Sequence, residues 1–198
     1  MNFKHIKAVL LTLTLACTSA NATLITHESR SIAGGFSSTD LLDSWNALSN
    51  TITSKEVTSF VNVRPGNNKL NILTLDFNTN YADTWTFEAG LDAGLGAEFY
   101  LNGNLISSTY RDLWWSNNWN SRNVFAVNDL MINEGKNTIQ IVWAEGCCNG
   151  GNSIRFTDFR GEATLLTTDS LRAASVPEPQ TIALLGAALL GLRLRSRK

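Results

Sequence analysis

Alternating apolar residues between positions 57 and 167 constrain the fold of this chain more than any other feature. From Leu73 to Phe77 every second residue is apolar, and Ile139, Ile141 and Trp143 repeat the pattern. Such a period of two places the apolar side chains on one face of an extended strand. The same alternation occurs in three shorter segments: 84–87, 98–101 and 153–157. These segments are rich in β-branched and aromatic residues, which strands favour.

Turn sequences divide the strands. Asn102-Gly103 offers two residues that tolerate positive φ, as a two-residue hairpin requires, and Glu134–Asn137 predicts another turn. Strands at short spacing with such turns indicate an all-β fold, an antiparallel β-sandwich of the jelly-roll type. Apolar residues at helical spacing in Ser38–Leu48 favour a helix there, with an irregular lead-in segment as the alternative.

The charge distribution argues against nucleic-acid binding. The chain of 198 residues has a net charge of −1, yet residues 23–175 hold 16 acidic and 10 basic side chains, a net of −6. A nucleic-acid-binding domain needs a basic surface to neutralise phosphates. We expect one domain over residues 23–170, large enough for a real core, and no cofactor.

The N-terminus has the three parts of a secretory signal peptide. Two lysines precede a short apolar run over residues 8–16, and Ala20 and Ala22 occupy the positions that a signal peptidase reads. We therefore predict that residues 1–22 are a signal peptide, with the Sec translocon and signal peptidase as partners. Lipidation of Cys17 is the alternative.

The C-terminus is also tripartite. Val176-Pro177-Glu178-Pro179 precedes an apolar run over residues 181–192, which has no polar face. The two prolines favour an extended segment, and the run suits a short membrane-embedded helix that is below full spanning length. A basic tail follows, formed by Arg193, Arg195, Arg197 and Lys198. Residues 171–175 are expected to be a linker between the domain and this signal.

This C-terminal arrangement resembles the PEP-CTERM sorting signal of Gram-negative bacteria, with Pro177-Glu178-Pro179 at the motif position. The resemblance covers residues 176–198. It implies export, transient anchoring in the inner membrane, processing by an exosortase, and delivery to the cell surface or extracellular matrix. It also implies an association with exopolysaccharide and biofilm.

Two further resemblances concern the middle of the chain. Cys147-Cys148-Asn149-Gly150 is similar to the motif of the CCXG group of PEP-CTERM proteins, for which it implies no activity. The strand and Asn-Gly turn at 99–106, with the later strand at 134–141, loosely resemble galactose-binding-like and PA14-like jelly rolls. This second likeness bears on the fold more than on any ligand site.

Cys147 and Cys148 are the two cysteines left once residues 1–22 are removed. Consecutive Cα atoms lie about 3.8 Å apart, which is below the usual disulfide range of about 4.4–6.8 Å. An oxidising compartment nevertheless allows a vicinal disulfide. Intermolecular bridges between neighbouring chains, or a metal or redox site, are the alternatives.

A loop rich in Trp and Asn contains Trp114, Trp115 and Trp119. One interpretation is a glycan-binding platform, because Trp faces stack on sugars while nearby polar groups form hydrogen bonds. The other is that one or two of these rings plug the open end of the sandwich. Since Trp114 and Trp115 are adjacent, a strand would turn them to opposite sides.

Catalysis has little support in the sequence, and we predict no catalytic or metal-binding residues. His27, the sole histidine after residue 22, is expected to be a solvated terminal residue. A glycosidase needs two carboxylic acids, but the available ones are expected to form a solvated acidic surface. These candidates are Asp83, Glu88, Asp92, Glu98, Asp112 and Glu145. A calcium site that uses Asp83, Asp92 and Asp129 lacks an Asp-x-Asp-x-Asp-Gly loop.

Overall fold

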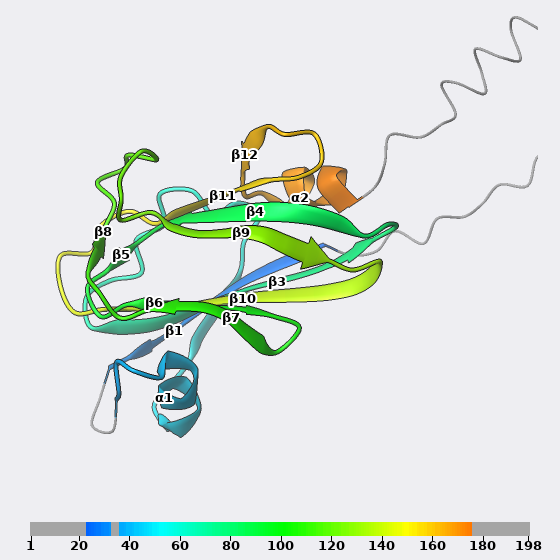
Figure 1. Cartoon of the computed structure of the whole chain (residues 1–198). Coiled ribbons are helices and arrows are strands. Elements are labelled where there is room, and N and C mark those ends of the chain that lie inside the picture. Colours follow the sequence, from blue (N-terminus) through cyan, green and yellow to red (C-terminus); the bar gives the residue numbers. More distant parts are fainter. Residues whose placement is uncertain (1–22, 33–35, 176–198) are drawn as a thin grey trace, which may run out of the picture.

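The computed structural model describes residues 23–32 and 36–175, and the fold is the predicted antiparallel β-sandwich (Figure 1). The larger sheet has the strand order β2-β1-β3-β10-β6-β7. Its strands are β1 (Leu24–Ser31), β2 (Thr53–Glu56), β3 (Lys69–Thr79), β6 (Ala97–Leu101), β7 (Asn104–Thr109) and β10 (Gly135–Glu145). Every pairing in this sheet is antiparallel.

The second layer is a sheet with the order β12-β11-β4-β9. Its strands are β4 (Asp83–Gly90), β9 (Phe125–Ile132), β11 (Ser153–Thr157) and β12 (Ala163–Leu165). Two short strands, β5 (Asp92–Ala93) and β8 (Leu113–Trp114), pair with each other at one end of the sandwich.

The core lies between the two sheets and is largely aromatic. The ring of Trp85 stacks on Phe77 from the opposite sheet at 5.4 Å and on Phe156 at 5.3 Å, and all three side chains are at most 1% exposed. The alternating residues of β3 and β10 point into this core, as their period of two predicts.

Helix α1 (Leu41–Ala47) covers the outer face of the larger sheet. The helix predicted within Ser38–Leu48 is therefore confirmed, and the irregular segment is not. Asp40 caps the helix, because its carboxylate accepts a hydrogen bond from Asp43 N at 2.9 Å. Glu98 provides a second acceptor, for Leu41 N at 2.8 Å.

The predicted Asn-Gly hairpin also forms. Asn102 and Gly103 have φ values of 51° and 80°, and they connect β6 directly to β7. Both residues therefore occupy the left-handed region that this turn requires.

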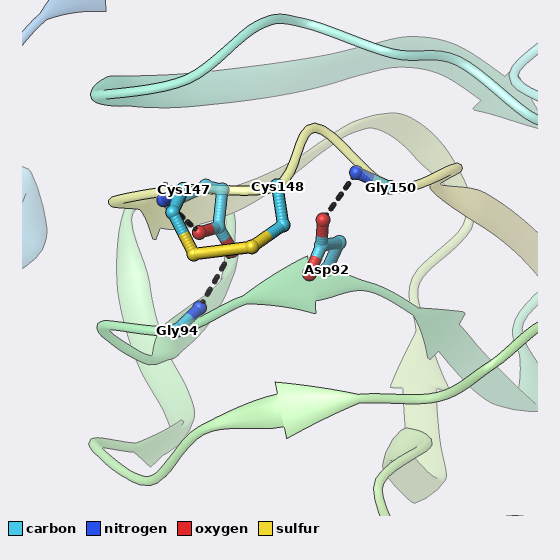
Figure 2. The surroundings of a disulfide bond; sticks show 6 residues. Asp92, Gly94, Cys147, Cys148 and Gly150 are labelled. Atoms are coloured by element: carbon cyan, nitrogen blue, oxygen red, sulfur yellow. Dashed lines mark hydrogen bonds between the residues drawn. A yellow bond between two sulfur atoms is a disulfide. The ribbon is translucent and has the colours of Figure 1, made fainter.

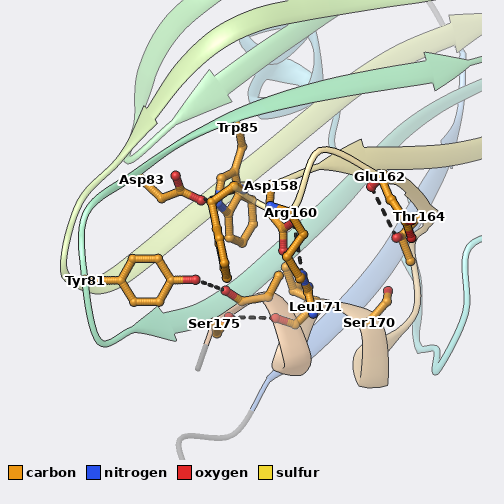
Figure 3. Close-up of polar contacts among 12 residues, drawn as sticks. Tyr81, Asp83, Trp85, Asp158, Arg160, Glu162, Thr164, Ser170, Leu171 and Ser175 are labelled. Carbon is orange, nitrogen blue, oxygen red and sulfur yellow. Dashed lines mark hydrogen bonds and ion pairs between the residues drawn. The ribbon is translucent and has the colours of Figure 1, made fainter. Parts of the chain in front are cut away.

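Helix α2 (Thr168–Ser175) closes the domain near the β3–β4 hairpin (Figure 3). Tyr81 donates its hydroxyl proton to Ala174 O at 2.8 Å, and Leu171 and Ala174 are completely buried. Residues 171–175, expected to be a linker, thus lie within a packed helix, because Leu171 and Ala174 share its buried face. No helix in residues 23–32 and 36–175 is long and apolar enough to cross a membrane.

The last described residue, Ser175, accepts a hydrogen bond from Asn80 N in the turn between β3 and β4. This turn lies at the end of the sandwich opposite to β5 and β8 (Figure 1). The predicted signal peptide, with Ala20 and Ala22, and the sorting signal at 176–198 lie outside the described residues.

Candidate functional site

A pocket of about 260 Å³ opens at the end of the sandwich formed by β5 and β8. Three segments that are distant in sequence converge there: the start of β5, the segment leading into β8, and the loop after β10. Its lining consists of Asp92, Gly94, Asp112, Trp114, Glu145, Cys147 and Cys148.

Glu145 joins two of these segments (Figure 2). It is the last residue of β10 and is 3% exposed. Its carboxylate accepts hydrogen bonds from Gly94 N at 2.9 Å and from Cys147 N at 2.5 Å. The carboxylate therefore holds the cysteine loop against the segment that follows β5.

Asp92 makes the next connection. It is 5% exposed, and its carboxylate accepts a hydrogen bond from Gly150 N (Figure 2). The backbone N–H of Asp92 donates to the Asn152 side chain at 2.9 Å. Gly150 packs closely here, since a Cβ would lie 2.5 Å from the Asp92 carboxylate and 2.6 Å from the Trp114 ring, and one of these groups would have to shift.

The acidic residues of the pocket influence one another. Burial raises the pKa of Asp92, and the hydrogen bond from Gly150 opposes this increase. Glu145, through its charge and as a hydrogen-bond partner, and Asp112, through its charge, raise the pKa of Asp92 further. Asp92 therefore holds its proton to a higher pH than an ordinary aspartate does.

The two cysteines are joined as a vicinal disulfide in the structure, with their Cα atoms 3.8 Å apart. Cys148 and Asn149 have φ values of 76° and 44°, so the loop passes through the left-handed region. The disulfide faces the pocket and forms part of its wall beside Gly94 (Figure 2).

The three tryptophans do not form one exposed platform. Trp114 is 49% exposed and lines the pocket, whereas the adjacent Trp115 is 4% exposed and donates its indole N–H to Gly151 O at 2.7 Å. The Trp119 ring is tilted by 55° against Trp115, with 4.7 Å between the ring centres. It lies under the Arg155 guanidinium, with 4.5 Å between the guanidinium carbon and the ring centre. Trp115 is thus buried, as the plug interpretation expects, whereas Trp114 stays exposed at the pocket. The two adjacent rings point to opposite sides, as predicted.

The expected solvated surface is wrong for three of the six carboxylates, because Asp92, Glu98 and Glu145 are all buried. Glu98 accepts hydrogen bonds from the start of α1 and from the hydroxyl of Tyr100, whose pKa is raised, first by burial and then by this bond. Glu88 pairs through two hydrogen bonds with Arg155, at 2.7 and 2.8 Å.

Two other expectations concern residues away from the pocket. The carboxylate of Asp83 accepts the indole N–H of Trp85 at 2.7 Å. Among the described residues, no three His, Cys, Asp or Glu side chains are arranged so that they could hold a metal ion. The expectation that His27 is solvated is wrong. Its ring stacks 5.7 Å from Trp143, and burial lowers its pKa despite opposing contributions from Asn71 and Glu28.

Sequence reasoning identified most residues of the pocket but assigned them to separate sites. The cysteines, Trp114 and the carboxylates were each considered alone. These residues converge because Asn152 binds the backbone of Asp92 and because β5 pairs with β8. Strands of two residues are too short to show a periodic pattern, so the sequence does not predict this pairing.

Comparisons with known proteins identify the C-terminal segment. Residues 175–198 match the PEP-CTERM protein-sorting motif. The chain carries a PEP-CTERM sorting signal. This motif indicates an exported protein that is sorted by an exosortase and whose C-terminal signal is cleaved. The comparisons do not confirm membership of the CCXG group.

Solved structures similar to the β-sandwich include two PA14 domains. A PA14 sugar-binding domain from an RTX adhesin is 9% identical, covers 75% of this chain and 97% of its own, and has a TM-score of 0.47. The PA14 domain of the MpAFP antifreeze protein is 13% identical, covers 81% and 96%, and also has a TM-score of 0.47.

An anti-sigma factor domain-containing protein is 9% identical with a TM-score of 0.51, and the match covers 80% of this chain and 50% of that protein. This likeness supports the sandwich fold alone. No curated protein matches the chain by sequence.

Proposed function

We propose that this protein is an exported, exosortase-processed module of the bacterial surface or extracellular matrix, and that it is adhesive rather than catalytic. Its pocket binds carbohydrate. The observation that carries the proposal is the half-exposed Trp114 ring in the same pocket as the carboxylate of Asp112.

The chemistry of the pocket suits a sugar. A flat indole face packs against the C–H side of a pyranose ring, while carboxylates accept hydrogen bonds from neighbouring hydroxyl groups. The disulfide adds a compact apolar wall of two sulfur atoms beside these acceptors. A volume of about 260 Å³ is close to the lower end of ligand pockets and suits one or two sugar rings.

The position of the pocket suits presentation at a surface. It opens beside β5 and β8, at the end opposite to Ser175, after which the sorting signal begins (Figure 1). While the C-terminal signal is held at the membrane, the pocket therefore faces away from the attachment point.

A surface glycoside-active enzyme is the alternative from a different class. Asp92 and Glu145 are the two buried carboxyl groups of the pocket, and both accept hydrogen bonds from backbone N–H groups. Glycosidase carboxyl pairs stand about 5–9.5 Å apart, so that the sugar, or the sugar and a water, fits between them. In this pocket both buried carboxyl groups are instead occupied in holding the cysteine loop to β5 and the residue after it, which favours binding over hydrolysis.

The route to the surface follows from the two ends of the chain. We propose translocation by Sec, cleavage by signal peptidase after Ala22, transient anchoring in the inner membrane of a Gram-negative cell, and exosortase processing near Pro177-Glu178-Pro179. Exopolysaccharide in the biofilm matrix is the proposed ligand. Mass spectrometry of the mature C-terminus in cells with and without the exosortase tests the route, and identical C-termini would contradict it.

A glycan array tests the binding function. The exported, processed protein should bind a defined set of glycans, and Trp114→Ala should abolish that binding. Phe159→Ala is the matched control, because Phe159 is another exposed aromatic residue, 55% exposed, outside the pocket lining. Equal loss in both variants, or no binding by the parent protein, would contradict the proposal. Release of sugar products from polysaccharide would favour the enzyme.

A further inference from the structure

We infer that the pocket is selective for a cationic amino sugar, such as the glucosamine units of a de-N-acetylated polysaccharide. This inference rests on the proposed sugar-binding function and names the class of ligand. Two independent features support it: the charge of the pocket lining, and a hollow that contains an exposed aromatic ring.

All charged residues of the pocket lining are acidic. Asp92, Asp112 and Glu145 line the pocket, and no Lys, Arg or His in the described part of the chain does so. The lining thus holds three carboxyl groups and no basic side chain to offset them. Such a lining repels uronic acids and other anionic sugars and attracts an ammonium group.

The nearby cations lie outside the pocket lining and bond to neutral oxygens. Arg64 donates to Asn149 O at 3.0 Å and Lys69 donates to the Ser31 hydroxyl at 3.1 Å, and neither belongs to the lining. Arg111, next to Asp112 in sequence, donates to Arg122 O at 2.8 Å. No basic side chain of the described residues enters the pocket, so an ammonium group of a ligand meets acidic side chains alone there.

Asp112 is the carboxylate best placed to receive that charge. Asp92 and Glu145 already accept backbone N–H groups, whereas the Asp112 side chain has no hydrogen-bond partner within residues 23–32 and 36–175. An ammonium group has three N–H donors, and charge-assisted bonds to carboxylate are the strong ones.

Trp114 distinguishes an amino sugar from a bare cation. Its ring offers one surface both for stacking against the sugar and for attraction of the ammonium through the negative face of the π system. The ring and the three carboxylates line the same pocket, so one glucosamine residue can contact both. An inorganic cation has no need of the apolar surface provided by Trp114 and the disulfide.

Calorimetric titration of the exported, processed protein tests the inference. The probes are a β-linked glucosamine tetramer, its fully N-acetylated counterpart, a glucuronic acid oligomer and spermidine, all near pH 6. The glucosamine tetramer should bind about tenfold more tightly than the N-acetylated one, which lacks the charge and keeps the sugar frame. Its affinity should fall as salt rises from about 0.05 to 0.5 M, because screening weakens exposed charge pairs.

Matched variants isolate the charge. Asp112→Asn keeps the shape of an exposed side chain, and it should lower affinity for the glucosamine tetramer about tenfold while leaving the N-acetylated tetramer within about twofold. Asp129→Asn is the control, because it removes one exposed carboxylate on β9, outside the lining, at a φ of 54° that Asn tolerates.

The outcomes separate this inference from the proposed function. Equal, Trp114-dependent binding of both tetramers would overturn selectivity for the amine and leave sugar binding intact. Stronger binding of the glucuronic acid oligomer, or equally tight binding of spermidine, would also overturn it. No binding of any sugar would remove both the inference and the function on which it rests.

Discussion

Replacement of Gly150 by Ala is the sharpest test of how the pocket is assembled. Gly150 donates its backbone N–H to Asp92, and its Cα faces both Asp92 and Trp114. An added Cβ would lie 2.5 Å from the Asp92 carboxylate oxygen and 2.6 Å from a carbon of the Trp114 ring. Because both contacts are far below van der Waals separation, the carboxylate, the ring or the loop must move.

The magnitude follows from these two contacts. A hydrogen bond to a buried carboxylate contributes about 1.5–3 kcal/mol to stability. Insertion of a methyl group into a filled site costs about 1–3 kcal/mol through strain. Movement that relieves the strain also breaks the bond, so the two values are not additive. We expect a loss of about 3 kcal/mol in the free energy of unfolding, which for a domain of this size lowers Tm by about 6–12 °C.

Thermal unfolding followed by circular dichroism, with the disulfide intact, measures this loss. Gly146→Ala is the matched control in the same loop, because a Cβ at Gly146 has no heavy atom within 4 Å. That variant should be neutral or more stable by about 0.4–1 kcal/mol, since it reduces the entropy of the unfolded chain. Equal Tm values for the two variants would refute the packing of Gly150 against Asp92 and Trp114.

Three further substitutions test individual side chains. Glu98→Gln should lower the free energy of unfolding by about 1–2 kcal/mol, because the first N–H groups of α1 lose a charged acceptor. Urea unfolding measures this loss, and sugar binding should not change. The pKa of His27 is lowered chiefly by burial, so the unfolded chain takes up the proton first, and stability should fall as the pH drops below about 6.5. His27→Gln should flatten that decline in urea titrations between pH 7.5 and 5.5, and an unchanged slope would contradict the burial of the ring. The pKa of Asp92 is raised chiefly by burial, so the folded state favours the protonated carboxyl group more than the unfolded chain does. The stability that this protonated group contributes should be lost as the pH rises from about 3.9 through the raised value. Asp92→Asn should remove this loss in urea titrations from about pH 3.5 upward, and a decline that persists in the variant would disprove the reasoning.

The sandwich could be predicted because its strands follow one simple rule. The alternation in β3 and β10 places their apolar side chains in the core between the sheets. The same rule does not predict that the outer face of β3 is also buried. Leu70 and Ile72 face outward and are nevertheless buried, because α1 covers that face of the sheet. A period of two identifies one buried face, and a packed helix on the other face adds apolar residues that blur the pattern.

The pocket could be predicted only in pieces. Trp114 and Trp115 were expected to diverge, and the strand geometry of β8 separates them into an exposed and a buried ring. The burial of Asp92 and Glu145 could not be foreseen, because acidic residues are usually exposed. Their acceptors are satisfied by backbone N–H groups of Gly94, Cys147 and Gly150, contacts that carry no sequence signature.

The pocket divides its acidic residues between structure and recognition. Glu145 and Asp92 hold the cysteine loop against the start of β5, so that their removal would change the shape of the pocket along with its charge. Asp112 and Trp114 are exposed, and the Asp112 carboxylate holds no other described segment in place. Substitutions at these last two positions therefore test recognition with the fold intact, whereas loss of binding after substitution of the first two would say little about the ligand. The buried carboxyl groups of Asp92 and Glu145 also disfavour an anionic ligand. They therefore determine that the ligand bound by Asp112 and Trp114 is neutral or cationic.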